Sequence, residues 1–250
     1  MIRNRDISAI IFDLIGTLAF QSVGYEHHIL KAFEAYENLE VEKKDFLKTW
    51  LSVEEKYSSD SALGLELLKE GKYREAMFPL REVNFLEKVE QILKRLGKYS
   101  TSETKKTIQD GFQKSWFANL SLPENVFGMI DKLSKKFTLG LVSNFQDANL
   151  LRKWLDEVGL SGYFKQYVVI SDEVGVRKPH PLLHELMQVK LNIESSTNIL
   201  YVGDNLVEDV YGPSYLGMQV ILINNLSDMK NEKDRITKIP NILELKKILL

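Results

Sequence analysis

Short runs of apolar, mostly β-branched residues occur at the start of the chain and again in its second half. The first covers residues 8–13, and similar runs lie at 138–142, 167–170, 198–202 and 219–223. Apolar runs of this length are typical of parallel strands that are buried on both faces. Amphipathic patterns that alternate with the later runs predict helices at 124–137, 146–158, 181–191 and 207–216. A last helix is predicted from about 239 to the end. Because strands alternate with helices, the pattern predicts an α/β core with a parallel sheet and right-handed crossovers.

The stretch between the first and second apolar runs has a different pattern, with almost no strand signal. Apolar residues at helical spacing, such as Phe85, Val89, Ile92 and Leu96, predict helices at 26–36, 42–57, 62–68, 82–96 and 102–117. The sequence therefore predicts an all-helical domain at 22–121, inserted into a core made of 1–21 and 122–250. The three tryptophans, Trp50, Trp116 and Trp154, lie on apolar helical faces and are predicted to be core residues, and the polar segment 226–234 is predicted to be a surface loop.

Composition narrows the class of protein without pointing to a partner. The chain has 250 residues, 44% of them hydrophobic and 27% charged, with a formal net charge of −2 and no cysteine. A charge near zero gives no field that favours nucleic acid or an anionic membrane, and the lack of cysteine excludes disulfides and thiolate chemistry. We find no signal-peptide pattern and no apolar segment of the roughly 20 residues needed to span a bilayer. We therefore expect a cytoplasmic protein with no nucleic-acid or membrane partner; its oligomeric state stays open.

Two of the predicted strands end in polar side chains that suit anion chemistry. Asp13 ends the first strand, and Gly16 after it permits a tight turn whose N–H groups face a bound anion. Ser143 and Asn144 end the second strand. Because ligands bind beyond the carboxyl ends of parallel strands, both pairs are candidate site residues. Each also has a simpler interpretation, since Asp13 could be a cap or loop aspartate and Ser143 an ordinary helix N-cap.

Two further motifs add a cation and a pair of acids. Lys178 precedes Pro179 and Pro181, which predicts a rigid turn around the lysine, although most lysines are simply solvated. Further along, a strand ends at Gly203-Asp204, and Asp209 follows within a turn of helix. Oxygen ligands at this spacing suit a hard cation such as Mg²⁺.

In this order, the four motifs resemble those of the haloacid dehalogenase superfamily, and the helical insert resembles the C1-type cap of that superfamily. The resemblance extends from Asp13 to Met218 and implies a Rossmann-like core. It implies a hydrolase in which Asp13 is the nucleophile and forms a covalent aspartyl intermediate. Ser143 would bind the transferring group, and Lys178 would neutralise charge on the nucleophile and the substrate.

The resemblance also implies a cofactor and a substrate class. Mg²⁺ would offset the repulsion between Asp13 and an anionic substrate, most simply a small phosphorylated metabolite. The implied metal ligands are Asp13, the backbone carbonyl of Ile15, and Asp204, with Asp209 as the supporting acid. The implied substrate-binding residues are Gly16, Thr17, Ser143 and Asn144.

Ile15 departs from the pattern of the superfamily's phosphatases, which usually carry a second aspartate two residues after the nucleophile. That aspartate protonates the leaving alcohol and then activates water, a function that contributes about 10²–10⁴-fold. Isoleucine has no proton to transfer. A phosphatase with Ile15 would need a good leaving group, such as an acyl or aryl phosphate, or an acid from the insert, for which Glu26, His27 and His28 are candidates. The simpler interpretation of those three residues is a solvated helix start.

Two other interpretations of Ile15 stay open. The 2-haloacid dehalogenases of the superfamily also lack the second aspartate, but Asp204 argues against one, and so does leucine at Trp50-Leu51, where those enzymes place an arginine. Phosphonatases lack it too and use a cap lysine, for which Lys31, Lys43 and Lys44 are available but unspecific. Alternatively, the chain is a binding protein that lost turnover, although several costly charges in one cleft argue against this.

Overall fold

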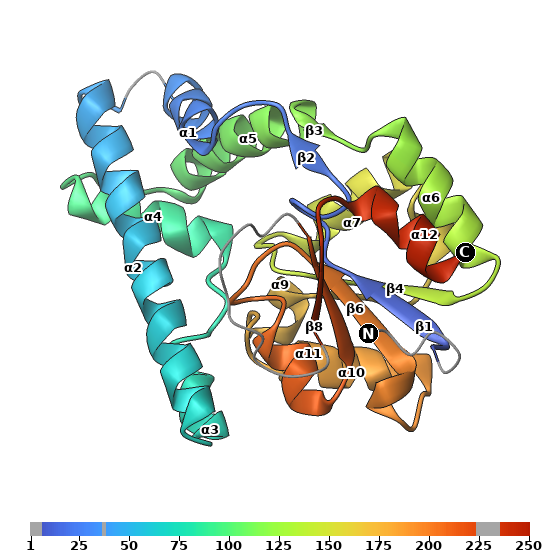
Figure 1. Ribbon diagram of the computed structural model, residues 1–250. Coiled ribbons are helices and arrows are strands. Elements are labelled where there is room, and N and C mark those ends of the chain that lie inside the picture. Colours follow the sequence, from blue (N-terminus) through green and yellow to red (C-terminus); the bar gives the residue numbers. More distant parts are fainter. Residues whose placement is uncertain (1–6, 37–38, 224–235) are drawn as a thin grey trace.

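The core of the protein is a six-stranded sheet in which all paired strands run parallel (Figure 1). The computed structural model describes residues 7–36, 39–223 and 236–250. The strand order is β5-β4-β1-β6-β7-β8. The bounds are β1 (Ala9–Phe12), β4 (Thr138–Ser143), β5 (Val168–Ile170), β6 (Ile199–Gly203), β7 (Gln219–Ile223) and β8 (Ile236–Ile239). The chain leaves β1 toward β4 and β5 on one side and returns to β6 on the other, so β1 lies where the strand order reverses. This is the position at which open α/β sheets bind ligands.

Alternate residues of each central strand pack on opposite faces of the sheet, as a strand period of two requires. Ile10 and Phe12 of β1 belong to one buried cluster, and Ala9 and Ile11 belong to another. The first cluster is covered by α6 (Glu124–Ser134), α7 (Ala148–Glu157), α8 (Ser161–Phe164) and α12 (Leu245–Leu249). The second is covered mainly by α10 (Leu182–Leu191) and α11 (Tyr211–Leu216). Helices therefore lie on both faces, and the predicted α/β class with a parallel, Rossmann-like sheet is confirmed.

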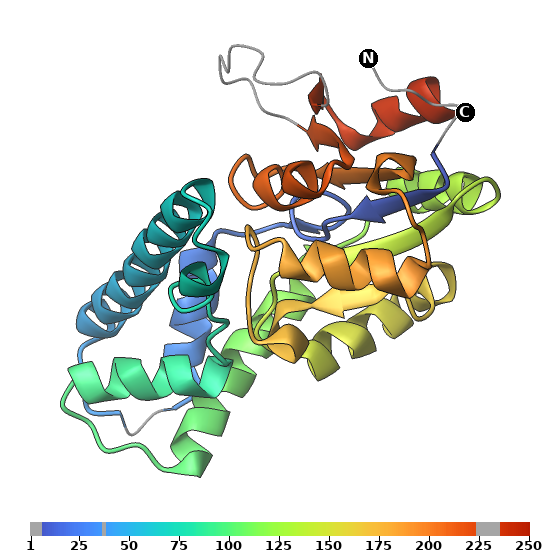
Figure 2. The same cartoon turned by 90° about the horizontal axis from the view of Figure 1, so that it is seen from below.

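The helices between β1 and α6 form a separate group beside the sheet (Figures 1 and 2). They are α1 (Tyr25–Glu34), α2 (Lys43–Lys69), α3 (Tyr73–Ala76), α4 (Phe85–Arg95) and α5 (Ser102–Ala118). They bury their own cluster around Trp50, which includes Phe46, Phe85 and Phe112. The short strands β2 (Phe20–Gln21) and β3 (Leu120–Ser121) pair antiparallel and join the two ends of the group. We call residues 22–121 the helical insert; its assignment as a cap domain stays a prediction.

Several predicted elements differ from those observed. The segments 42–57 and 62–68 form the single helix α2, because Ser58, Ser59 and Ser61 donate their hydroxyls to carbonyls four residues earlier and so do not break the helix. The predicted helix at 207–216 begins only at Tyr211. The predicted C-terminal helix from about 239 is shorter, because 236–239 form the unpredicted edge strand β8 and 242–244 a 3₁₀ turn. The predicted loop at 226–234 lies outside the described residues.

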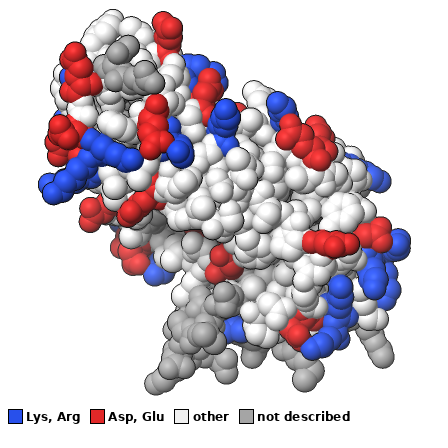
Figure 3. All heavy atoms as spheres, turned by 90° about the horizontal axis from the view of Figure 1, so that it is seen from above, with Lys and Arg blue, Asp and Glu red and all other residues white. Residues whose placement is uncertain are grey.

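One face of the molecule shows how its charged side chains are distributed. Acidic and basic side chains are interspersed on the face drawn in Figure 3, with no broad area of one sign. Within the described ranges, every helix is too short or too polar to traverse a lipid bilayer.

Candidate active site

The carboxyl ends of β4, β1 and β6 bring the predicted site residues together. Ser143 ends β4, Asp13 follows β1, and Asp204 follows β6, and these are three neighbouring strands. Together they line a cavity of about 110 Å³. The full lining consists of Asp13, Ile15, Ser143, Asn144, Asp204, Asn205, Glu208 and Asp209. Sheet topology alone therefore places six residues of the predicted site around one small cavity.

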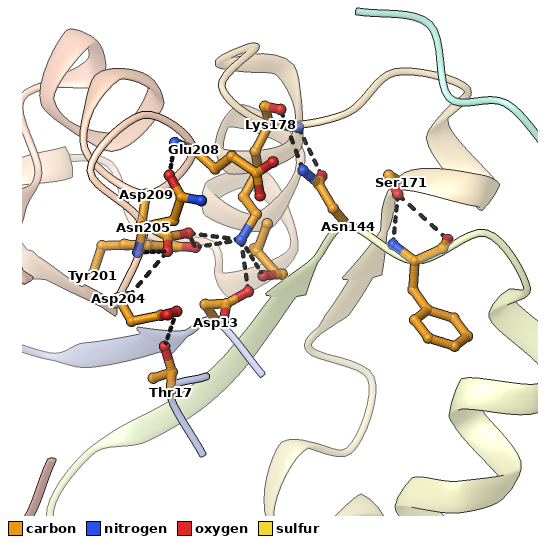
Figure 4. A network of polar contacts seen from close by, with 12 residues as sticks. Asp13, Thr17, Asn144, Ser171, Lys178, Tyr201, Asp204, Asn205, Glu208 and Asp209 are labelled. Carbon is orange, nitrogen blue, oxygen red and sulfur yellow. Dashed lines mark hydrogen bonds and ion pairs between the residues drawn. The ribbon is translucent and has the colours of Figure 1, made fainter. Parts of the chain in front are cut away.

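Lys178 is the buried cation at the centre of this group (Figure 4). Its Nζ donates to Asp13 Oδ1 at 2.7 Å and to Asp209 Oδ1 at 2.7 Å. It also contacts the Tyr201 hydroxyl at 3.2 Å and the Val142 carbonyl at 3.4 Å. Burial by itself lowers the pKa of Lys178, but Asp13 and Asp209 outweigh it and hold that pKa well above its usual value. The ammonium therefore stays charged beside Asp13.

Asp209 uses both carboxylate oxygens to fix the site. Oδ1 accepts from Lys178 and from the Tyr201 hydroxyl, the latter at 2.8 Å. Oδ2 accepts from the backbone N–H groups of Asp204, at 3.1 Å, and Asn205, at 2.9 Å. Its contacts thus join the end of β6 to the lysine. This arrangement suits an acid that positions other groups more than one that gives both oxygens to an ion.

Three acids in the cavity have more negative charge than the single lysine balances. Each of Asp13, Asp204 and Asp209 has a carboxylate oxygen within 4.8 Å of those of the other two. The pKa of Asp13 is raised to about 7. Burial is the largest cause, Lys178 opposes it, and Asp209 and Asp204 add to the rise. Burial and Asp209 also raise the pKa of Asp204. A bound Mg²⁺ would relieve this excess charge, and carboxylate oxygens are its preferred ligands. The residues therefore fit a magnesium site.

The turn after β1 is built around Asp204. Gly16 has φ +92°, and a β-carbon placed there would come within 2.4 Å of Asp204 Oδ2. The buried Thr17 donates its hydroxyl to Asp204 Oδ1 at 3.2 Å. Gly16 and Thr17 were predicted to bind substrate, but here they contact Asp204 and are not among the residues that line the cavity. They are placed to orient that carboxylate.

Asn144 holds the backbone of Lys178 in place. Asn144 Oδ1 accepts the Lys178 N–H at 2.8 Å, and Asn144 Nδ2 donates to the Lys178 carbonyl at 3.2 Å. Ser143 is buried and lines the cavity beside Asp13. The loop after β4 therefore supplies a hydroxyl in the cavity and a clamp on the lysine segment.

A model of haloacid dehalogenase-like hydrolases matches residues 7–217 of the chain, which include every residue of this cavity. The chain belongs to the haloacid dehalogenase-like hydrolase family. The membership inferred from the four motifs is thus confirmed. In that family setting, the charged cavity at the sheet edge is the candidate active site of this hydrolase.

A curated relative and two solved structures are similar to the chain. The chain is 31% identical over 136 residues to glyceraldehyde 3-phosphate phosphatase of Methanothermobacter thermautotrophicus, a match that covers 51% of this chain and 58% of the relative. The chain thus spans little more than half the length of that curated relative. Two solved structures share its fold. A haloacid dehalogenase-family phosphatase from Thermococcus onnurineus has TM-score 0.63 and 21% identity, over 97% of this chain and 98% of that one. The L-2-haloacid dehalogenase of Xanthobacter autotrophicus has TM-score 0.60 and 18% identity, with the same coverage.

The haloacid dehalogenase-like fold brings none of the insert's candidate acids to Asp13. Glu26 and His27 are exposed. His28 is buried, its Nδ1 bonds Ser115 Oγ at 2.9 Å, and burial lowers its pKa. None of the three lines the cavity around Asp13. Ile15 lies there instead, half-buried, so among the described residues the usual position of the second aspartate is filled by a hydrocarbon.

The residues considered for a dehalogenase or a phosphonatase also lie away from the Asp13 cavity. The residues that line the Asp13 cavity include no arginine, and Trp50 is fully buried in the insert. Lys31 and Lys43 pair with Glu34 on the surface of the insert. Tyr201 has no role in the predicted site, but it belongs to the site through its contacts with Lys178 and Asp209. A tyrosine inside the apolar run Ile199–Gly203 was a usable signal, because a buried hydroxyl requires a partner.

Proposed function

We propose that the protein is a Mg²⁺-dependent phosphatase that uses Asp13 as a nucleophile and acts on small phosphate compounds with a good leaving group. The observation that carries the proposal is the contact of Lys178 Nζ with Asp13 Oδ1 at 2.7 Å, in a cavity whose acids exceed its cations. The Lys178 ammonium lowers the pKa of Asp13 against the larger effect of burial, and so favours the ionised carboxylate that attack on phosphorus requires. The relative named as a phosphatase supports the same chemistry.

In the proposed reaction, a carboxylate oxygen of Asp13 attacks phosphorus, and the bond from phosphorus to the leaving oxygen breaks. The leaving oxygen carries the bonding electron pair and takes its proton from water. A second water then attacks the aspartyl phosphate, which releases inorganic phosphate and restores Asp13. Lys178 stabilises negative charge that develops beside it, and Ser143 is placed to bind a phosphate oxygen. Asp13, Asp204 and the Ile15 carbonyl would hold Mg²⁺, which offsets the repulsion between nucleophile and substrate.

Ile15 determines which phosphates are favoured. Because it has no proton to give, the leaving oxygen must depart with little assistance. Acyl and aryl oxygens leave as weaker bases than alkoxides do. We therefore assign the activity to activated phosphates rather than to simple alkyl esters.

A substrate panel tests the proposal. The purified chain is given Mg²⁺ with acetyl phosphate, an aryl phosphate, an alkyl phosphate or 2-chloropropionate, and phosphate and chloride release are measured. We expect phosphate from the two activated substrates only, loss of release with a chelator, and recovery when Mg²⁺ is added back. The Asp13→Asn variant is expected to release none. Chloride release that a chelator leaves intact would instead assign a dehalogenase, and silence on all four with Mg²⁺ bound would assign a binding protein.

A further inference from the structure

A second cavity lies beside the Asp13 cavity and has a different chemical character. It has a volume of about 200 Å³ and lies between the helical insert and the core loops after β4 and β6. Five aromatic side chains from separate parts of the chain line it: Tyr25 of α1, Phe85 of α4, Phe112 and Trp116 of α5, and Phe145 of the loop after β4. We call it the aromatic cavity. Ligand pockets for drug-sized molecules run from about 300 to 1,000 Å³, so this one suits a group of one or two rings.

The aromatic cavity adjoins the proposed catalytic cavity. Asn144 and Glu208 line both of them. Asn144 is bonded to the backbone of Lys178, whose Nζ contacts Asp13. Figure 4 shows Asn144 and Glu208 both next to Lys178. A group attached to a phosphorus held at Asp13 would therefore have the aromatic cavity next to it.

The rings of this cavity present faces and edges against which a further aromatic ring could pack. Phe112 and Trp116 are stacked, with centroids 5.7 Å apart, and Tyr25 meets both edge-on, at 5.5 and 6.0 Å. Sequence analysis assigned Trp116 to the core, but it is only half-buried, as are Tyr25 and Phe145. Aromatic rings with centroids about 4.5–7 Å apart attract each other beyond the effect of the area that they bury. The half-buried rings retain surface on which a flat ligand would gain such contacts.

Charge in the aromatic cavity disfavours a second anionic group on the ligand. Its charged lining consists of three acids, Glu82, Asp147 and Glu208, and one base, Arg177. Arg177 lowers the pKa of both Glu82 and Glu208, although burial, the larger cause, raises both. Arg177 is outnumbered by these acids, and its guanidinium donates to the Tyr57 carbonyl at 2.6 Å. A neutral ring meets no penalty here, and a ring with an ammonium group would be attracted to the acids and to the aromatic faces.

The chemistry at Asp13 points independently to the same class of ligand. Ile15 leaves no proton donor in the usual place, so a leaving oxygen with a low pKa is favoured. The phenolic hydroxyl of tyrosine has a pKa of about 10. A phenolate is therefore a weaker base than an alkoxide and can leave before it takes a proton from water. A phenolic leaving group thus meets the requirement at Asp13 and provides the ring that the adjoining cavity fits.

We propose that the leaving group of the substrate is a small aromatic alcohol without a second anionic group, bound in the aromatic cavity against Trp116 and Phe145. This inference rests on the proposed phosphatase function and specifies its substrate class. Glu208 and Asn144 would then lie at the junction where the ring is joined to the phosphate.

Four substrates test the proposal in the wild-type protein with Mg²⁺. Acetyl phosphate is activated but has no ring, 1-naphthyl phosphate has both properties, benzyl phosphate has a ring but an alkyl oxygen, and 4-carboxyphenyl phosphate adds an anion. We expect 1-naphthyl phosphate to have the lowest KM, and 4-carboxyphenyl phosphate to have a KM at least about tenfold higher. Hydrolysis of acetyl phosphate with equal KM for the two aryl esters would overturn the cavity assignment alone. No phosphate from any of the four would overturn the phosphatase proposal as well.

Matched variants separate ring binding from leaving-group chemistry. Trp116→Leu removes one ring of the cavity from α5 and Phe145→Leu removes one from the core loop after β4, whereas Phe127→Leu removes a half-buried ring that packs on Tyr163 elsewhere in the core. The readout is the ratio of kcat/KM for 1-naphthyl phosphate to kcat/KM for acetyl phosphate. We expect this ratio to fall about 3- to 10-fold in the two cavity variants, as expected for the loss of one ring contact, and to stay at the wild-type value in Phe127→Leu. An unchanged ratio in both cavity variants, each shown to be folded by its thermal unfolding, would overturn the proposal.

Discussion

Gly16 lies so close to Asp204 that a β-carbon at Gly16 would meet the Asp204 carboxylate within 2.4–2.8 Å. The side chain that ends β6 therefore depends on the absence of a side chain in the turn after β1. Two strands that are far apart in sequence are adjusted to each other at this contact. Any group added at Gly16 would move Asp204 from the place where it faces Asp13.

We predict that Gly16→Ala weakens Mg²⁺ binding at least about tenfold. Gly71 offers a matched control, because it also has positive φ, +77°, but a β-carbon there would meet nothing within 4 Å. Both variants carry the backbone cost of about 1–2 kcal/mol for an L-residue in this conformation. The measurement is the rise in melting temperature on addition of Mg²⁺. It should shrink in Gly16→Ala and persist in Gly71→Ala; equal loss in both would show that backbone strain, and not Asp204, is responsible.

Asp13→Asn is predicted to make the metal-free protein more stable at pH 8 than the wild type. The pKa of Asp13 is raised from 3.8 to about 7, chiefly by burial. Between these values the folded state keeps a proton that the unfolded state has lost, so the stability of the wild type falls as pH rises through this window. Asparagine has no such titration.

The measurement for Asp13→Asn is thermal unfolding at pH 5 and pH 8 without divalent metal. The melting temperature of the variant, relative to the wild type, should be higher at pH 8 than at pH 5, by about 2–4 °C for each kcal/mol. Asp131→Asn serves as a control, since Asp131 is a surface acid with a lowered pKa. A pH-independent difference between Asp13→Asn and the wild type would contradict the prediction.

Tyr201→Phe tests whether the buried hydroxyl positions the acid and the lysine. The hydroxyl donates to Asp209 at 2.8 Å and accepts from Lys178 at 3.2 Å. Its removal should lower the free energy of unfolding by about 1–3 kcal/mol, because two buried charges lose a partner. We also expect a lower kcat with little change in KM, since Tyr201 does not line the cavity. In Tyr163→Phe, which loses a bond of 3.4 Å to Asp131 at the surface, the free energy of unfolding and kcat should both stay close to their wild-type values.

Ile15→Asp should raise the turnover of alkyl phosphates by at least about tenfold, and by up to the 10²–10⁴-fold that general acid–base catalysis supplies. Ile15 lines the Asp13 cavity, so an acid there could reach the leaving oxygen. Ile15→Asn is the matched control, because it is polar and of similar size to aspartate but has no proton to transfer. The measurement is kcat on an alkyl and an aryl phosphate. No gain in folded Ile15→Asp, or an equal gain in Ile15→Asn, would show that the missing acid does not limit the enzyme.

The core fold and the order of the charged residues in the site could be predicted from the sequence. Apolar runs such as 219–223 became strands almost without change, because β-branched residues buried on both faces have few alternatives. Asp13, Ser143 and Asp204 each stand at the end of such a run, so parallel pairing was enough to predict that they meet at one edge. Ile15 was visible in the same way, as a departure from a short motif.

The surroundings of those residues depend on contacts between distant segments, which are seen only in the folded chain. The contacts of Gly16 and Thr17 with Asp204 join segments that are far apart in the chain, and no local pattern records such distances. The continuity of α2 depended on serine hydroxyls bonding within the helix, and the pairing of β2 with β3 depended on the two ends of the helical insert lying together. The aromatic cavity is formed by α1, α4, α5 and a core loop, so the partial exposure of Trp116 followed from packing between separate elements, which periodicity along one helix does not determine.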